Sequence, residues 1–249
     1  WLRQTFLLRA GLLGIGSWHF TLDDNPALDP KYVASLKAEY VGLWYRRFID
    51  GEWCLAEGAI YPMWDPDRHV VAEVPQIVQW IAAGVDHGST NPFHAVLVGV
   101  GVDRRLYITS EWRHDAKLAR RDMSDAEYSI EVRKWLAETG VTPDYVVVDP
   151  AAKPFRVALA RDGLDVYPGD NTVVDGIRTV ASLLATDRLA VHASCRHLID
   201  EFPGYSWDDK AAERGEDHPI KVADHGLDAT RYAIHTTRSI WRDIVTPAA

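Results

Sequence analysis

The pattern of apolar and polar positions changes at about residue 76. Three apolar runs then follow one another with short links, at residues 77–85, 93–100 and 106–112. Runs of this length, separated by turn residues, predict three consecutive strands of an antiparallel meander. A further run, at residues 145–148, is apolar at every position. Such a run is typical of a strand that is buried on both faces of a sheet.

Helices are expected to alternate with strands after the meander. A helix is predicted to run from Ser124, a capping residue, to Glu138. Its apolar positions are Tyr128, Ile130, Val132, Trp135 and Leu136. Further helices are predicted near residues 152–161, 173–186 and 223–240, with strands at 164–167 and 189–193. Strands and helices in this order indicate an α/β domain with a mixed sheet.

The remaining segments are expected to be less regular. Residues 1–28 are interpreted as a connector, and Asp29 with Pro30 predicts the start of a helix. Aromatic and proline-rich residues 44–75 predict a short hairpin and an irregular linker, and the polar residues 204–219 an exposed hairpin or loop.

Two parts of the chain are therefore expected, residues 1–75 and residues 76–249. The sequence begins with Trp1 and not with Met, so we expect it to be a segment of a longer protein.

Composition narrows the class of protein. The chain has 249 residues, and 36 acidic against 27 basic side chains give it a formal charge of −9. Two cysteines exclude a disulfide scaffold and a four-cysteine zinc site. We expect no membrane span, because no apolar run approaches the roughly 18 residues that one needs. The excess of acidic residues argues against a protein that coats nucleic acid through its overall charge, but it allows local contacts with nucleic acid.

The candidate chemistry lies in acidic residues at the ends of predicted elements. Asp86 and Asp149 end two predicted strands, and Asp224, His225 and Asp228 begin the last helix. At about 100° per residue, Asp228 lies roughly 40° from Asp224 and 60° from His225, so the three can face one site. Oxygen ligands with an imidazole suit Mg²⁺ or Mn²⁺, and two such ions can promote phosphodiester hydrolysis.

Each of these residues also has an ordinary structural interpretation. Asp86 and Asp149 are of a type that often forms turns or caps helices. Asp224 is equally well interpreted as the N-cap of its helix, and a lone histidine such as His225 is more often a surface residue.

Five segments together resemble the nuclease domain of the large subunit of tailed-bacteriophage terminases, the motors that package viral DNA. They occur in order over about residues 23–235 and are DNPALDPKYVASLKAEYVGLWYRRFIDGEW, VDHGSTNP, VVVDPAA, PGDNTVVDGI and KVADHGLDATRYAI. The resemblance implies a ribonuclease H-like fold, that is, a mixed sheet flanked by helices. It also implies a metal-dependent endonuclease that cleaves double-stranded concatemeric viral DNA during packaging, with two Mg²⁺ or Mn²⁺ ions.

The resemblance also assigns roles to residues. Asp86 and Asp149 match the first two metal ligands and Asp228 the final acidic ligand, and these three are the expected catalytic residues. His225 and Asp224 match positions at which relatives place an additional ligand, and which of the two contacts metal stays open.

Residues 1–75 would be the tail of the ATPase domain and a linker, and residues 76–249 the nuclease domain. No segment matches the phosphate-loop pattern G-x-x-x-x-G-K-[ST], so ATP hydrolysis by that route is not expected. Implied partners are double-stranded DNA, the terminase ATPase domain, the small terminase subunit and the portal protein, in the host cell cytoplasm and without a membrane.

Four basic residues are candidates for DNA contact. Arg104 and Arg105 lie in the turn between the second and third predicted strands, where they are expected to flank the site. Lys153 closely follows Asp149. Arg231 lies one helical turn after Asp228, where it either pairs with that carboxylate or holds a phosphate. Basic residues of this kind are more often part of a solvated surface.

Three alternative functions remain open at this point. The first is another ribonuclease H-like nuclease, of the resolvase or transposase type. The second is a non-catalytic module that docks to the portal or the motor. The third is a phosphotransfer enzyme of the actin and sugar-kinase class, because VDHGSTN resembles its Asp-x-Gly-x-Thr loop.

Overall fold

The structure is a computed structural model that describes residues 3–88 and 91–245. It consists of two compact units. The first comprises the residues up to 56 together with residues 209–217, and the second comprises residues 57–208 and those from 218 onward. Ser89 and Thr90, in the predicted VDHGSTNP segment, lie outside the described residues.

The first unit is helical. Asp29 begins its longest helix as the sequence predicts, because its carboxylate accepts hydrogen bonds from the amides of Lys31 and Tyr32. Arg47 forms an ion pair with Asp217. The regular elements of this unit are η1 (Arg3–Leu7), α1 (Ala10–Leu13), η2 (Leu22–Asp24), α2 (Pro30–Glu39), α3 (Gly42–Phe48) and α10 (Asp209–Glu213).

The second unit is built on a seven-stranded sheet with the strand order β1-β7-β4-β3-β2-β5-β6. Its β2–β3 and β3–β4 pairs are antiparallel, which confirms the meander, and the other pairs are parallel. The mixed sheet is therefore confirmed. The strands are β1 (Val70–Val71), β2 (Ile77–Asp86), β3 (Phe93–Gly101), β4 (Leu106–His114), β5 (Tyr145–Val148), β6 (Val166–Pro168) and β7 (Leu189–His192).

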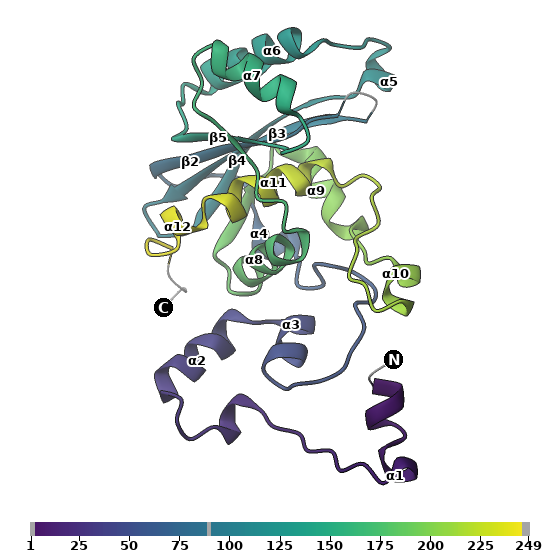
Figure 1. The fold of residues 1–249 in the computed structure, drawn as a ribbon. Coiled ribbons are helices and arrows are strands. Elements are labelled where there is room, and N and C mark those ends of the chain that lie inside the picture. The colour runs from purple at the N-terminus through teal and green to yellow at the C-terminus, as the bar shows by residue number, and fades with distance from the viewer. Residues whose placement is uncertain (1–2, 89–90, 246–249) are drawn as a thin grey trace. The chain divides into compact units, whose positions relative to one another are not determined.

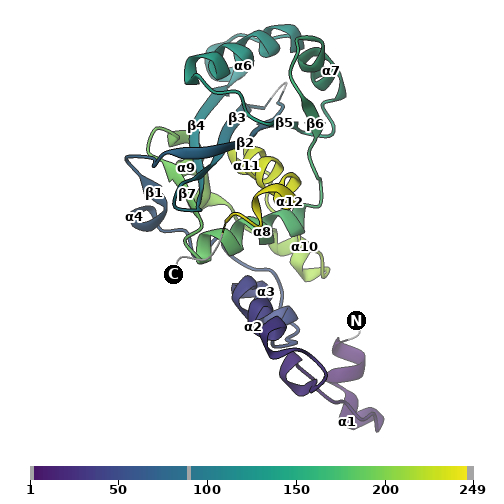
Figure 2. The ribbon, with the colours of Figure 1, turned by 90° about the vertical axis from the view of Figure 1, so that its left-hand side faces the viewer.

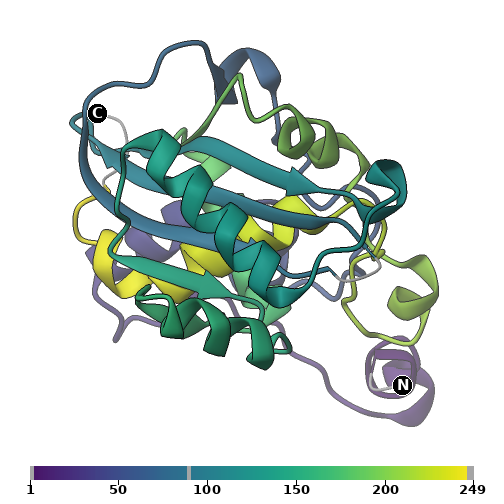
Figure 3. The same ribbon diagram turned by 90° about the horizontal axis from the view of Figure 1, so that it is seen from above.

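Helices cover both faces of this sheet (Figures 1 and 2). Helices α6 and α7 lie on one face, where Figure 3 shows them in front of the strands, and α8 and α11 lie on the other. The helices of this unit are α4 (Pro66–His69), α5 (Ala116–Ala119), α6 (Asp125–Thr139), α7 (Lys153–Arg161), α8 (Val173–Ala185), α9 (Arg196–Glu201), η3 (Phe202–Gly204), α11 (His225–Thr236) and α12 (Arg238–Trp241).

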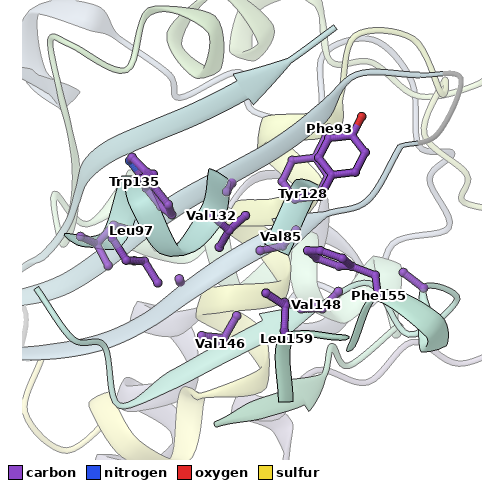
Figure 4. Packing of buried hydrophobic residues seen from close by; sticks show 14 residues of the cluster. Val85, Phe93, Leu97, Tyr128, Val132, Trp135, Val146, Val148, Phe155 and Leu159 are labelled. Carbon is purple, nitrogen blue, oxygen red and sulfur yellow. The ribbon is translucent and has the colours of Figure 1, made fainter. Parts of the chain in front are cut away.

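A hydrophobic core fills the space between the sheet and the pair α6 and α7 (Figure 4). The core side chains alternate along the strands, as in Ala83 and Val85 of β2 and Val146 and Val148 of β5. Residues between them point to the opposite face, because successive side chains of a strand alternate. This alternation decides which residues face α11.

The predicted helix at residues 124–138 is confirmed, with one error in its apolar face. Ser124 and Glu127 form a reciprocal capping box at its start. Ile130, however, is 53% exposed. It lies two residues, or about 200°, from the buried Tyr128, so it points away from the sheet.

Three predictions about irregular or terminal segments are correct only in part. Residues 44–75 contain α3, α4 and β1 but no hairpin, and β1 pairs with the distant β7. Residues 204–219 contain the helix α10, and Tyr205 and Trp207 are buried. The last predicted helix is divided, because α11 ends at Thr236 and α12 follows. A pattern within the chain does not reveal such long-range partners.

Among the residues that the structure describes, no helix combines the length and the apolar composition that crossing a lipid bilayer requires.

Helix α11 packs very closely against the sheet at Gly84 of β2. A Cβ atom at this position would lie 2.1 Å from the carbonyl oxygen of Ala229 and 2.7 Å from the Cβ of Ala233. Both atoms belong to α11, and one is backbone, so a side chain at Gly84 could be accommodated only by moving the helix.

We therefore expect Gly84→Ala to destabilise the second unit by roughly 1–3 kcal/mol, the usual cost of overpacking. Urea unfolding monitored by circular dichroism measures this loss. Gly204→Ala is the control, because a Cβ at Gly204 has no atom within 4 Å. Equal stability of the two variants would contradict the packing argument.

Candidate functional site

Two of the candidate carboxylates lie side by side at one end of the sheet. Asp86 ends β2, and Asp149 directly follows β5, its parallel neighbour. The amide of Asp149 donates a hydrogen bond to the carbonyl of Val85 at 2.9 Å. Both aspartates alternate with core residues, so their side chains belong to the face that α11 covers.

Helix α11 brings His225 to this end of the sheet. Its Nδ1 lies 2.8 Å from Oδ2 of Asp86. Burial raises the pKa of Asp86 above its ordinary value, the bond to His225 opposes this, and the charges of Asp228 and Asp149 add to the rise. The pKa of His225 is raised by its hydrogen bond to Asp86. His225 thus connects α11 to Asp86, and Asp228 lies three residues, about one helical turn, further along the same helix.

Asp228 is paired with two cationic side chains. Arg231 donates from Nε and Nη2 to its Oδ1, both at 3.1 Å, and Nζ of Lys221 lies 2.6 Å from its Oδ2. Burial alone would lower the pKa of Lys221, but the carboxylates of Asp228 and Asp224 outweigh this and raise it. The ammonium group is therefore held as a countercharge between two carboxylates.

Asp224 occupies the N-cap position of α11, but its side chain does not cap the helix. Its Oδ2 is buried and forms an ion pair with Nζ of Lys221, 3.1 Å away, but the geometry of this pair is not that of a hydrogen bond. The ordinary interpretation of Asp224 as a helix cap is therefore correct for its position and wrong for its side chain.

The donor set fits a hard divalent cation, although it is not arranged around one. Within residues 3–88 and 91–245, no three His, Cys, Asp or Glu side chains form a preformed metal site. The carboxylate oxygens instead contact Lys221, Arg231 and His225, and Oδ1 of Asp149 accepts the amide of Ala151 at 2.8 Å. Buried carboxylates that already hold an ammonium group are suited to Mg²⁺ or Mn²⁺ in chemistry and charge.

The turn that carries Arg104 and Arg105 lies at the opposite end of the sheet, which corrects the expectation that it flanks the site. Strand β3 begins beside Asp86 and ends beside Ile77, because it is antiparallel to β2. The ten residues of β2 span about 30 Å at roughly 3.3 Å each. A direct contact of these arginines with the carboxylates is excluded by that length.

Arg231 is not available to DNA in this structure. Its side chain is 1% exposed and forms the pair with Asp228, so the second of the two sequence-based interpretations, a phosphate contact, is not the one observed. Lys153 is exposed at the first residue of α7, shortly after Asp149.

Two basic residues at the site were not identified from the sequence. One is Lys221, whose only signal is its place three residues before Asp224. The other is Arg156, whose Nη1 donates to the carbonyls of Asp149 and Pro150 at 3.0 and 2.6 Å. Arg156, in the first turn of α7, thus holds the loop that joins β5 to this helix.

A mixed sheet with acidic residues at the carboxyl ends of two neighbouring parallel strands and on the helix packed across them defines a ribonuclease H-like domain. The family model of the Terminase RNaseH-like domain matches residues 83–237. The chain belongs to this family.

Individual proteins agree with this assignment. The chain is 24% identical over 233 residues to the terminase large subunit of Escherichia phage T5, covering 88% of this chain and 51% of that protein. It is 34% identical to the large terminase of a thermophilic bacteriophage, with a TM-score of 0.84, covering 96% of this chain and 58% of that one. The chain thus spans only about half the length of these two relatives.

The large terminase nuclease of another thermophilic phage, G20c, whose structure has bound magnesium, shares the fold. It is 15% identical, with a TM-score of 0.52 over 71% of this chain and 96% of that one.

The buried pair of Asp228 and Arg231 predicts a large effect on stability. Asp228→Ala leaves the buried guanidinium without its carboxylate, so we expect a loss of about 3–5 kcal/mol in the free energy of unfolding. Chemical denaturation measures it.

Asp175→Ala is the matched control, because Asp175 pairs with Arg178 at the same spacing but with side chains 48% and 31% exposed. That variant should lose less than about 1 kcal/mol. Similar losses in both variants would show that burial does not decide the strength of the pair.

Proposed function

We propose that this chain is the DNA-cutting domain of a packaging terminase: an endonuclease that hydrolyses double-stranded concatemeric viral DNA with two Mg²⁺ or Mn²⁺ ions. The observation that carries the proposal is the grouping of Asp86, Asp149 and Asp228 on one face of the sheet. Membership of the terminase family favours this function over a resolvase, a transposase or a docking module.

Asp86, Asp149 and Asp228 would hold the ions, with Asp224 or His225 as the additional ligand. Bound Mg²⁺ or Mn²⁺ would supply activation of a water molecule and stabilisation of the leaving oxygen of the phosphodiester. The residues of this chain would position these ligands. His225 orients the Asp86 carboxylate, and Arg231 fixes the Asp228 carboxylate. Gly84 allows α11 to pack closely against β2.

Lys153 is the basic residue best situated to contact a DNA strand near the carboxylates, because it is exposed and follows Asp149 closely. Arg104 and Arg105, about 30 Å away by strand length, could contact only a more distant part of the same duplex. The formal charge of −9 implies weak and salt-sensitive binding by this chain alone.

In the infected host cytoplasm, the ATPase domain, the small terminase subunit and the portal protein would deliver the DNA. Residues 1–75 would be the tail of that ATPase domain and the linker to residues 76–249.

The direct test is cleavage of supercoiled plasmid DNA by the 249-residue chain. We expect nicking and linearisation with Mn²⁺ or Mg²⁺ and none with EDTA. Asp86→Ala or Asp149→Ala should reduce the rate to below about 1% of wild type, because metal ions contribute several kcal/mol to transition-state stabilisation.

Asp144→Ala is the control for this test. Asp144 is an exposed aspartate directly before β5, at the end of the sheet away from the site. Its carboxylate accepts a hydrogen bond from the side-chain amide of Gln79. The control should cut normally. Normal cutting by Asp86→Ala and Asp149→Ala would remove the basis of the proposal.

Lys221 is expected to compete with the divalent cation, because its ammonium group contacts Asp228 and Asp224. Lys221→Met should therefore tighten Mn²⁺ binding, measured by titration calorimetry, by roughly tenfold, since it removes a positive charge beside two carboxylates. Lys134→Met, at an exposed lysine of α6, changes the net charge equally and should leave the affinity unchanged. Unchanged or weaker binding by Lys221→Met would contradict this competition.

A further inference from the structure

The start of α11 departs from the way in which this chain ordinarily begins a helix with an aspartate. Asp29, Asp65 and Asp115 are the N-caps of α2, α4 and α5, and each accepts backbone amides of its own helix. Asp224 holds the same position in α11 and accepts none. The amides at the start of α11 must therefore be satisfied by another group.

Glu201, the last residue of α9, supplies the missing acceptor. Its Oε2 accepts hydrogen bonds from the amides of Gly226 at 2.7 Å and Leu227 at 3.1 Å. These are the second and third amides of α11, the donors that an N-cap side chain ordinarily satisfies. Glu201 is only 7% exposed, so these bonds are shielded from water.

His94 of β3 lies beside Glu201, at ion-pair distance. The ring is fully buried, with Nδ1 3.5 Å from Oε1 of Glu201 and Nε2 2.9 Å from Oε2 of Glu111. Burial alone would lower the pKa of His94, but the two carboxylates raise it. Glu111 in turn accepts the amides of His197 and Leu198, at the start of α9. The two carboxylates that accept the first amides of α9 and α11 thus lie on either side of one buried histidine.

The packing around Gly226 leaves little freedom in this arrangement. A Cβ atom at Gly226 would lie 2.6 Å from Cε1 of His94 and 3.0 Å from Oε2 of Glu201. The first turn of α11 can approach both side chains only because residue 226 is glycine.

The backbone before α11 turns Asp224 away from the capping conformation. Ala223 has a φ of +50°, in the left-handed region that residues with a side chain rarely adopt. Asp224 has φ −123° and ψ 10°, whereas Asp29, Asp65 and Asp115 are extended. The Asp224 carboxylate, relieved of capping, lies beside the ammonium of Lys221.

We propose that Glu201, oriented by His94, is a positioning residue of the cation site: it caps α11 in place of Asp224 and so leaves the Asp224 carboxylate available to a divalent cation beside Asp228. The inference rests on the proposed function, because it assigns a purpose to a carboxylate of that site.

The test compares variants of Glu201 that separate its length from its charge. Glu201→Asp keeps the charge but shortens the side chain, so it can no longer reach both amides. Glu201→Gln keeps the length and one acceptor oxygen. We expect Glu201→Asp to weaken Mn²⁺ binding, measured by titration calorimetry, about 10–100-fold, the usual effect of losing an outer partner of a ligand. Glu201→Gln should stay close to wild type.

Ser124→Ala is the matched control, because it removes the cap of α6, on the opposite face of the sheet. It should lower the stability and leave Mn²⁺ binding unchanged. A wild-type Mn²⁺ affinity of Glu201→Asp would overturn the proposal. An equal loss of Mn²⁺ affinity in Glu201→Asp and Ser124→Ala would also overturn it.

Hydrogen exchange of the first turn of α11 gives a second measurement without metal. Glu201→Asp should accelerate exchange there, and Ser124→Ala should not. If the wild-type chain bound no Mn²⁺, the proposed function would fail by itself, whereas unchanged exchange in Glu201→Asp would overturn the capping role alone.

Discussion

The constraint on which this site depends is the gathering of several carboxylates at one end of a sheet. Burial and the neighbouring charges raise the pKa of Asp86. Like charges this close are stable only when cations or hydrogen-bond donors accompany them. In the structure this is done by His225 for Asp86 and by Lys221 and Arg231 for Asp228. A divalent cation would meet the same electrostatic demand, which links the stability of the domain to its proposed chemistry.

The close approach of α11 to the sheet makes this gathering possible. Gly84 lets the helix contact the backbone of β2, and Gly226 lets the first turn contact His94. The first turn of α11 therefore lies at the ends of β2 and β5, where His225 contacts Asp86. The geometry of such a site would depend on two glycines and on the neighbouring His94 and Glu201 in addition to the carboxylates themselves.

Much of the sheet and its helices could be predicted, because their signals are local. The apolar runs gave the meander and β5, and Ser124 with Glu127 gave the start of α6. The predictions that were wrong concern features that depend on spatial arrangement and not on a local pattern. β1 was missed because two residues pair with a distant strand, and Ile130 was assigned to the core although the helical angle turns it outward. Arg104 and Arg105 do not flank the site, because β3 runs antiparallel to β2 and ends at the opposite end of the sheet from Asp86.

The sequence by itself determined the candidate carboxylates, their places at element ends and the family resemblance, since each depends on residues that are near one another in the chain. Only the tertiary structure decided what neutralises them. Glu201 acts through a contact with a residue 25 positions later in the chain, which its sequence context does not predict. The Asp224 side chain lies beside Lys221 and does not cap α11, because Glu201 of another helix accepts the amides at the start of α11. Electrostatic partners are chosen by distance in space, and that distance exists only once the sheet and α11 have packed together.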